Sequence, residues 1–274
     1  MKITAWLGAM TLACLSLVAV AAEKDVYREY VDDTVARFTP IIVDFYVEKT
    51  LKPHQKKYWP VVDHFVKNLL FTEDFKKVSA DIYRKYLTKK EVTYLASVVL
   101  SKDCSSLFTA EIMSKLSEKK PFISNDFEPT EACLEKIKKY HHIFDKRTKW
   151  SKESNELFRT STKKALPEFV ERLKQQKLIF DTAEKLNKTL PRTLEEGFDW
   201  VDIIGMYQVL EYRYLVNDIF DDGEVYELDT ESLRQVVCEQ FQEAFKDYIS
   251  VRHIAFDLHY RRVGESTVSL SECP

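Results

Sequence analysis

Apolar residues recur at helical spacing along the chain up to about residue 187. Between residues 73 and 86, one predicted stripe consists of Phe75, Val78, Ile82 and Tyr86, at the three- and four-residue spacing of an amphipathic helix. The tetrad Thr88–Glu91 has the form of a capping box and predicts the start of the next helix. We therefore expect residues 23–187 to form a helical domain.

A second apolar seam contains a proline. It consists of Phe158, Thr162, Ala165, Phe169 and Leu173. Pro167 lies within this seam, has no backbone N–H, and its ring clashes with the carbonyl of the preceding turn. The pattern predicts a helix that is kinked or broken at Pro167.

Beyond Leu190 the apolar period changes from that of a helix to alternation. Strands are predicted over residues 210–216 and 253–260, with a short third strand near 268–270. A helix capped by Asp229 or Thr230 lies between the first two. The fold class is α+β, with the helical domain followed by a module, residues 188–274, of one helix on a three-stranded antiparallel sheet. The stretch 187–200 is the predicted linker.

The first 22 residues have the pattern of a secretory signal peptide. Lys2 precedes an apolar run, and the small residues at 19–22 come directly before charged Glu23. Cleavage after Ala21 or Ala22 fits this pattern, whereas an uncleaved membrane anchor fits it less well. No later apolar stretch approaches membrane-spanning length. We expect a periplasmic or secreted protein without a transmembrane span after cleavage.

Composition narrows the function classes. The net charge is −3 and only 5 glycines are present. Nucleic-acid binding needs a concentrated basic face, and phosphate-cradling loops need glycine, so we expect no nucleic-acid partner, no nucleotide and no other cofactor.

Four cysteines remain after the signal peptide: Cys104, Cys133, Cys238 and Cys273. An even number in an oxidising compartment indicates two disulfides, and four cysteines allow three connectivities. We favour a Cys238–Cys273 bridge, which would fasten the chain terminus to the predicted helix, and a Cys104–Cys133 bridge within the helical domain. The alternative is that one or both pairs are free, buried thiols.

Two segments resemble uncharacterised exported proteins. Phe71–Phe75 and Tyr86–Glu91 resemble the helical repeat of the DUF2059 family, although Val98–Asp103 replaces the Ser-Pro-x-Gly element of that family. The C-terminal pattern, which includes Cys238 and Cys273, resembles a second type of periplasmic module. These resemblances imply location and fold, and they imply no chemistry.

Candidate chemistry is sparse. His253, Asp257 and His259 fall on the face of the predicted second strand opposite its apolar face, which consists of Ile254, Phe256, Leu258 and Tyr260. They are weak candidates for a metal site that would need a further ligand. The alternative is a solvated polar strand face. Aromatic residues on neighbouring strands predict either a helix-contacting core or, less favoured, a ligand groove: Tyr212, Tyr214, Phe256 and Tyr260.

No catalytic motif with a defined spacing is present. We therefore expect an exported, non-enzymatic protein that binds a protein partner in or beyond the cell envelope or supports the envelope. A hydrolase with a scattered site and a small-ligand carrier are the alternatives. The sequence leaves the oligomeric state open.

Overall fold

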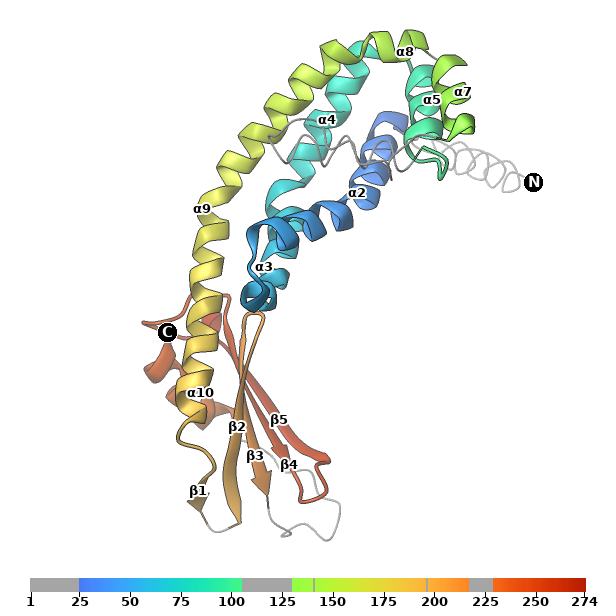
Figure 1. Cartoon of the computed structure of the whole chain (residues 1–274). Helices are drawn as coiled ribbons and strands as arrows, with labels where there is room; N and C mark the ends of the chain where they lie inside the picture. The colour runs from blue at the N-terminus through green and yellow to red at the C-terminus, as the bar shows by residue number, and fades with distance from the viewer. Residues whose placement is uncertain (1–24, 105–129, 140, 196, 217–228) are drawn as a thin grey trace, which may run out of the picture. The chain divides into compact units, whose positions relative to one another are not determined.

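The computed structural model describes residues 25–104, 130–139, 141–195, 197–216 and 229–274 (Figure 1). The chain divides into two compact units. The first comprises residues up to 48 together with 66–164, and the second comprises residues 49–65 together with 165–274. The predicted signal peptide, residues 1–22, lies outside the described residues.

Helices make up the described part of the first unit. They are α2 (Val26–Thr50, whose last two residues belong to the second unit), the π-helical turn η2 (Phe65–Leu70, whose first residue belongs to the second unit), α4 (Glu73–Tyr86), α5 (Lys89–Val99), α7 (Glu131–Lys139), α8 (His141–Asp145) and the first half of α9 (Arg147–Asn187). The predicted capping box is confirmed, because Thr88 Oγ1 accepts from the Glu91 N–H and the Glu91 carboxylate accepts from the Thr88 N–H.

The predicted stripe on α4 is only partly right. Ile82 is buried, but Val78 is 43% exposed, and the small residues Ser79 and Ala80 are buried instead. Small side chains allow close helix packing, and a pattern based on large apolar residues overlooks them.

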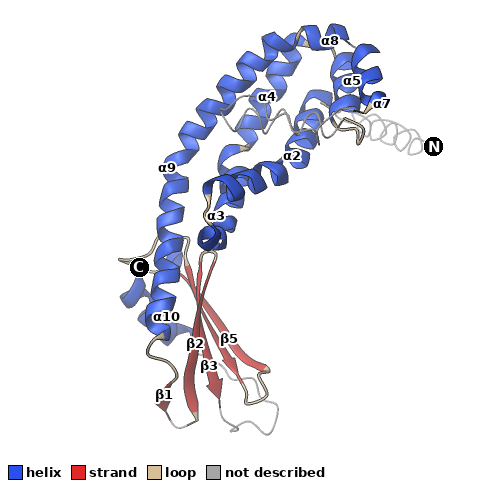
Figure 2. Ribbon diagram, viewed as in Figure 1, coloured by secondary structure: helices blue, strands red, loops and turns tan. Residues whose placement is uncertain are grey.

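The second unit contains a five-stranded sheet in the order β1 (Arg192–Glu195), β2 (Phe198–Met206), β3 (Val209–Val216), β4 (Ser250–Phe256) and β5 (Arg262–Ser269) (Figure 2). The α+β class is confirmed. The three-stranded antiparallel sheet is wrong, because β1 and β2 add to it and β3 pairs with β4 in parallel. Helix α10 (Thr230–Phe241) lies between β3 and β4 in the chain, and such a crossover suits parallel strands.

Two expectations about chain breaks are corrected by the structure. A break at Pro167 is wrong, because helix α9 continues through this residue. The predicted linker 187–200 contains the end of α9, strand β1 and the start of β2. The division between the compact units falls inside α9, between Lys164 and Ala165.

One core holds the second unit together. Its buried members come from α9, from β2 to β5, and from α10 and the segment after it, and include Ile179, Tyr212, Phe241, Val251 and Val268. Helix α9 approaches β2 closely at Gly205, where an added Cβ would lie 2.8 Å from the Phe180 ring. The remaining helical pieces of this unit are η1 (Pro53–Tyr58), α3 (Trp59–His64) and η4 (Leu270–Glu272).

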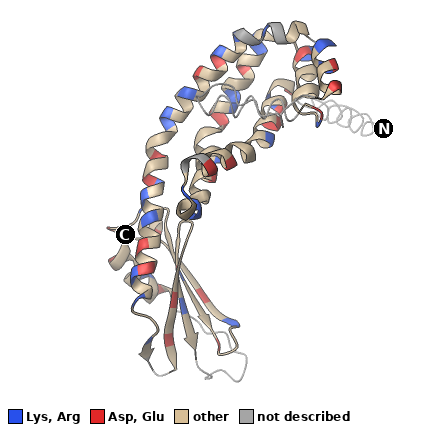
Figure 3. Ribbon diagram, viewed as in Figure 1, with Lys and Arg blue, Asp and Glu red and all other residues tan. Residues whose placement is uncertain are grey.

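Charged residues of both signs are interspersed along the helices (Figure 3). Within the described parts of the chain, no helix combines the length and apolar character needed to cross a membrane.

Candidate functional site

The three weak metal-site candidates do not form a group. Strand β4 ends at Phe256, so Asp257 and His259 lie in the following turn and not on the strand. The Asp257 carboxylate accepts from the backbone N–H groups of His259 and Arg261, at 2.8 Å each, and therefore serves as a turn cap. His259 is exposed. Among the described residues, no three His, Cys, Asp or Glu side chains gather in a way that could hold a metal ion.

His253 belongs to the core, so the predicted orientation of this strand is wrong. Val251, His253 and Ala255 face the core side of the sheet, opposite Leu210, Tyr212 and Tyr214 on β3. The sequence pattern had placed the apolar face on the even-numbered residues from Ile254 to Tyr260. Ile254 is also buried, whereas Tyr260 is 79% exposed.

An aromatic array runs across three strands on the core face of the sheet. Phe198 stacks on Tyr214 with ring centroids 5.0 Å apart, and Trp200 stacks on Tyr212 at 5.2 Å. The His253 ring then stacks on both tyrosines, at 5.1 and 5.8 Å. Tyr212 contacts Phe241 of α10 at 6.5 Å. The prediction that Tyr212, Tyr214, Phe256 and Tyr260 form a helix-contacting core is confirmed for Tyr212 and wrong for Tyr260, which is 79% exposed.

Burial controls the ionisation of this array. His253 is 5% exposed, and its Nδ1 lies 2.8 Å from the Tyr214 hydroxyl. Its Nε2 has no hydrogen-bond partner among the described residues. Desolvation lowers the pKa of His253 to about 4 and raises the pKa of both Tyr212 and Tyr214. The imidazole is therefore neutral at physiological pH.

The array contains residue types found in hydrolases, but they are not arranged for catalysis. Ser266 lies opposite His253 in the β4–β5 register. The Ser266 hydroxyl, however, lies 3.2 Å from the Thr230 hydroxyl, and the His253 Nε2 atom that would serve as a base is unpartnered. Nucleophilic catalysis requires a hydrogen bond between nucleophile and base. Both side chains are 5% exposed, so substrate would have to enter a packed core.

A second polar cluster, which the sequence did not indicate, lies where α9 meets the β2–β3 hairpin. Gln176 is 2% exposed, donates to the Met206 carbonyl at 2.8 Å and accepts from the Gln208 N–H at 3.1 Å. The Arg172 guanidinium lies 4.3 Å from the centre of the Tyr248 ring. Burial, followed by the positive charge of Arg172, lowers the pKa of His64. Because Gln208 has a φ of 60°, the glutamine contacts support a constrained turn.

The first unit contains a cavity of about 550 Å³ beside α2 and α4. Its walls include the helical turn before Pro40, where the missing N–H leaves the Ala36 carbonyl without a helical donor. The residues lining it are Arg28, Asp32, Val35, Ala36, Thr39, Pro40, Lys67, Phe71, Glu73 and Lys76.

Charges of both signs border this cavity. Arg28 pairs with Asp32 at 2.9 Å and with Glu73 at 2.5 Å. Lys76 pairs with Glu73 at 3.0 Å and lies 3.5 Å from Asp32. Hydrogen bonds from Lys76 and then Arg28 lower the pKa of Glu73. The cavity is open to solvent, and the charges at its border are paired with one another, so a charged ligand would have to exchange partners with them.

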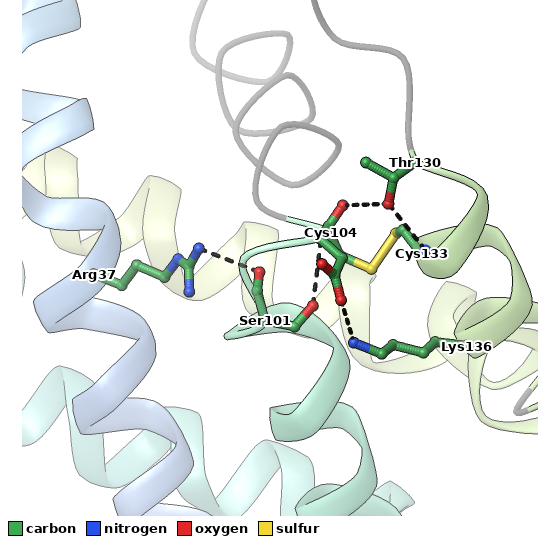
Figure 4. Close-up of a disulfide and its surroundings, with 7 residues drawn as sticks. Arg37, Ser101, Cys104, Thr130, Cys133 and Lys136 are labelled. Carbon is green, nitrogen blue, oxygen red and sulfur yellow. Dashed lines mark hydrogen bonds and ion pairs between the residues drawn. A yellow bond between two sulfur atoms is a disulfide. The ribbon is translucent and has the colours of Figure 1, made fainter.

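Both favoured disulfides are present. Cys104 bonds to Cys133, and Cys238 of α10 bonds to Cys273 near the chain end. Around the first bridge, the Thr130 hydroxyl accepts from the Cys133 N–H at 3.2 Å and donates to the Asp103 carbonyl at 3.1 Å (Figure 4). Lys136 pairs with Asp103 at 2.6 Å. The bridge thus joins the end of α5 to the start of α7.

Comparisons with known proteins add little to this picture. No protein-family model matches the chain. No curated protein matches it. A solved structure, described as the pilotin EpsS from the Vibrio vulnificus type 2 secretion system, is similar at 15% identity and a TM-score of 0.30, over 38% of this chain and 94% of that chain. At this TM-score the likeness supports no argument about fold or function.

Proposed function

We propose that this protein is exported and works in the periplasm or outside the cell as a non-enzymatic binding protein, with a protein partner in or beyond the cell envelope. The pair of disulfides carries this proposal, because they use all four cysteines that follow residue 22. Structural disulfides persist in oxidising compartments and are rare in the cytosol. The signal-peptide pattern at residues 1–22 points to the same compartment.

The use of the polar side chains supports a binding role over catalysis. His253 and Ser266 are packed inside the core, and Asp257 caps a turn. Each of these groups therefore has a structural task in the described fold. The similarity of Phe71–Phe75 and Tyr86–Glu91 to the DUF2059 helical repeat fits the same proposal, as does the similarity of the C-terminal segment to periplasmic modules.

Expression of the tagged chain in a bacterium, followed by fractionation, tests the proposal. We expect the protein outside the cytoplasm, with a mature N-terminus at Ala22 or Glu23. Alkylation without reductant should modify no cysteine of the mature chain, and alkylation after reduction should modify four. Cytoplasmic protein with an intact N-terminus and free thiols would refute export.

The binding role needs a separate measurement. After crosslinking in cells, the envelope fraction should contain a discrete complex of this chain with one other protein. The purified chain should bind the same protein in a separate pull-down. Hydrolysis of ester, peptide or glycoside substrates by purified protein, abolished by His253→Gln with the fold intact, would favour the enzyme instead.

A small-ligand carrier is the second candidate, and the cavity beside α2 and α4 favours it. A ligand with one cationic and one anionic group would exchange partners with the Arg28, Asp32, Glu73 and Lys76 network. Native mass spectrometry of gently purified protein should then show an added mass, which the double variant Arg28→Met/Lys76→Met loses. The exposed pair variant Arg159→Met/Lys163→Met serves as the control.

A further inference from the structure

An exposed basic segment precedes α3 in the second unit. From Leu51 to Val62 the sequence contains Lys52, Lys56 and Lys57 and no acidic residue. All three lysines are exposed. Beside them the large indole of Trp59 is 53% exposed, although indole side chains are usually mostly buried. The segment therefore combines positive charge with exposed aromatic surface.

The segment is held in place from its inner side. Val61 and Val62 are fully or almost fully buried, and Phe65 packs on Phe169 of α9 with ring centroids 4.6 Å apart. The Tyr58 ring meets Phe180 of α9 edge-on at 5.3 Å. Because these contacts fix η1 and α3 to α9, Trp59 is displayed from a packed support and not from a loose loop.

Exposed Glu48 and half-buried Asp63 flank the segment, and its three lysines outnumber them. The Lys57 ammonium lies 4.4 Å from the centre of the Phe180 ring. This contact fixes the position of the lysine side chain and leaves its positive charge in place. Asp181, which influences Tyr58, is paired with Lys177 of the same helix and adds no net charge. Lys52 and Lys56 are the other exposed lysines of the segment, seven and three residues before Trp59 in the sequence.

We infer that this face docks reversibly on an anionic phospholipid surface, with Trp59 at the headgroup level and Lys52 and Lys56 against the lipid phosphates. Indole side chains concentrate at membrane interfaces because one part is apolar and the other polar, and lysines near an anionic surface are attracted to it. One aromatic side chain with a few lysines gives weak, salt-sensitive attachment. The inference rests on one part of the proposed function, which is export to a compartment where the protein can reach a membrane of the cell envelope.

Vesicle flotation with the purified full-length mature chain tests this inference. We expect binding to vesicles of mixed phosphatidylglycerol and phosphatidylcholine, no binding to phosphatidylcholine alone, and release at high salt. The emission of Trp59 should shift to the blue on binding. Trp59→Phe should remove that shift while retaining most of the binding, because the aromatic surface remains.

Charge variants locate the binding face. Each lysine near an anionic surface contributes about five-fold in affinity, so Lys52→Ala/Lys56→Ala should weaken binding by roughly 25-fold. The control Lys163→Ala/Lys164→Ala removes two exposed lysines of α9 and should change binding little. Lys57 is left intact, since its replacement would also disturb packing on Phe180.

Three results would overturn the inference. One is an absence of binding to anionic vesicles by folded protein. Another is an equal loss of binding in both double-lysine variants, which would indicate general attraction without a defined face. The third is capture on polyglutamate beads without vesicle binding, which would assign the face to an acidic protein. All are measured in vitro, so they are independent of whether the chain is exported in cells.

Discussion

Both compact units bury apolar side chains, and they differ in the contacts that supplement this burial. The first buries Phe38, Val92 and Leu95, among others. Its ion pairs connect segments that are distant in sequence, such as Arg84 to Asp25 at 2.7 Å and Lys85 to Glu153 at 2.6 Å. In the second, a single apolar core and a stacked aromatic array bind the sheet to α9 and α10. A buried carboxylate lies within the sheet, where Glu211 is 2% exposed, meets Arg213 at 2.7 Å and lies 3.5 Å from Arg252.

This difference predicts different sensitivities. Exposed ion pairs are individually weak and are screened by salt, whereas buried apolar contacts are not. Salt and acid should therefore act first on the contacts between helices of the first unit. The second unit should respond chiefly to the loss of core side chains and to the charging of its buried histidine.

The largest expected effect concerns where the second unit begins. Ile179 and Ala183 of α9 are buried in the sheet core. A fragment of residues 188–274 lacks both, and the cost of exposing this face is several kcal/mol, comparable with the whole stability of a small domain. We expect no cooperative thermal transition for residues 188–274, and a cooperative one for residues 165–274, by circular dichroism.

The matched fragments make the comparison direct, because both contain the entire sheet, α10 and the Cys238–Cys273 bridge. Equal cooperative melting of the two fragments would show that α9 is dispensable and that the sheet and α10 suffice. Such a result would favour the sequence-based boundary at residue 188.

Local signals made the helices predictable. Thr88 with Glu91, and Asp229 before α10, are caps whose mechanism depends on neighbouring residues alone, and both were located from sequence. The number of cysteines and the expected compartment predicted two disulfides, and the pairing favoured among the three possible connectivities is the one present. The burial of Gln176 could not be predicted, because the polar run Lys174–Lys177 is typical of a solvent-exposed helix face. Gln176 is buried by the β2–β3 hairpin, which is distant in sequence.

Sheet pairing and orientation failed for a different reason. Residues 251–256 of β4 are apolar on both faces except at Arg252 and His253, so they do not indicate which face is buried. The apolar–polar alternation used for the prediction continued past the end of the strand to Tyr260, and it therefore assigned the core to the wrong face. The sequence order strand–helix–strand did contain the information for a parallel pair. The prediction gave too little weight to the crossover connection.

The second prediction compares the disulfides. The chain-entropy model gives about 4 kcal/mol for a bridge such as Cys238–Cys273, which spans 35 residues. Cys104–Cys133 spans 29 residues and should contribute almost as much. We expect Cys238→Ala/Cys273→Ala and Cys104→Ala/Cys133→Ala to lower the free energy of unfolding by similar amounts in urea titrations.

The location of the damage should differ between these variants. Hydrogen exchange should accelerate in β5 and η4 for the first pair and around Ser101–Cys104 for the second. Acceleration throughout the chain in either variant would show that the two units unfold together and would contradict the separate stabilisation argued above.

The third prediction concerns acid and the second unit. The folded pKa of His253 is about 4, compared with an ordinary value of 6.5. Below pH 6.5 His253 is protonated in the unfolded chain but stays neutral in the folded chain. The free energy of unfolding therefore falls as the pH is lowered to about 4, by roughly 3 kcal/mol in total. His253→Phe should remove this pH dependence, as measured by urea unfolding between pH 7 and 4. His259→Gln, at an exposed turn position, should leave it unchanged; an identical loss in that variant would assign the effect elsewhere.

The smallest expected effect lies in the first unit and in a lower pH range. A hydrogen bond from Lys146, followed by the Thr88 backbone N–H, lowers the pKa of Glu91 from 4.5 to about 2. A depressed carboxylate stabilises the fold above its unfolded pKa, and this contribution is lost as the pH falls from about 4.5 to about 2. Glu91→Gln should cost about 1–2 kcal/mol at pH 7, because it removes the charge but keeps a capping side chain. The exposed Glu156→Gln, which also breaks a surface ion pair, should cost less than about 0.5 kcal/mol.

If Lys146→Met already abolishes the effect of Glu91→Gln, the ion pair between Lys146 and Glu91 is responsible. If the two losses add, the capping box alone stabilises α5, and ion pairs between helices matter less to the first unit than the comparison with the second unit implies.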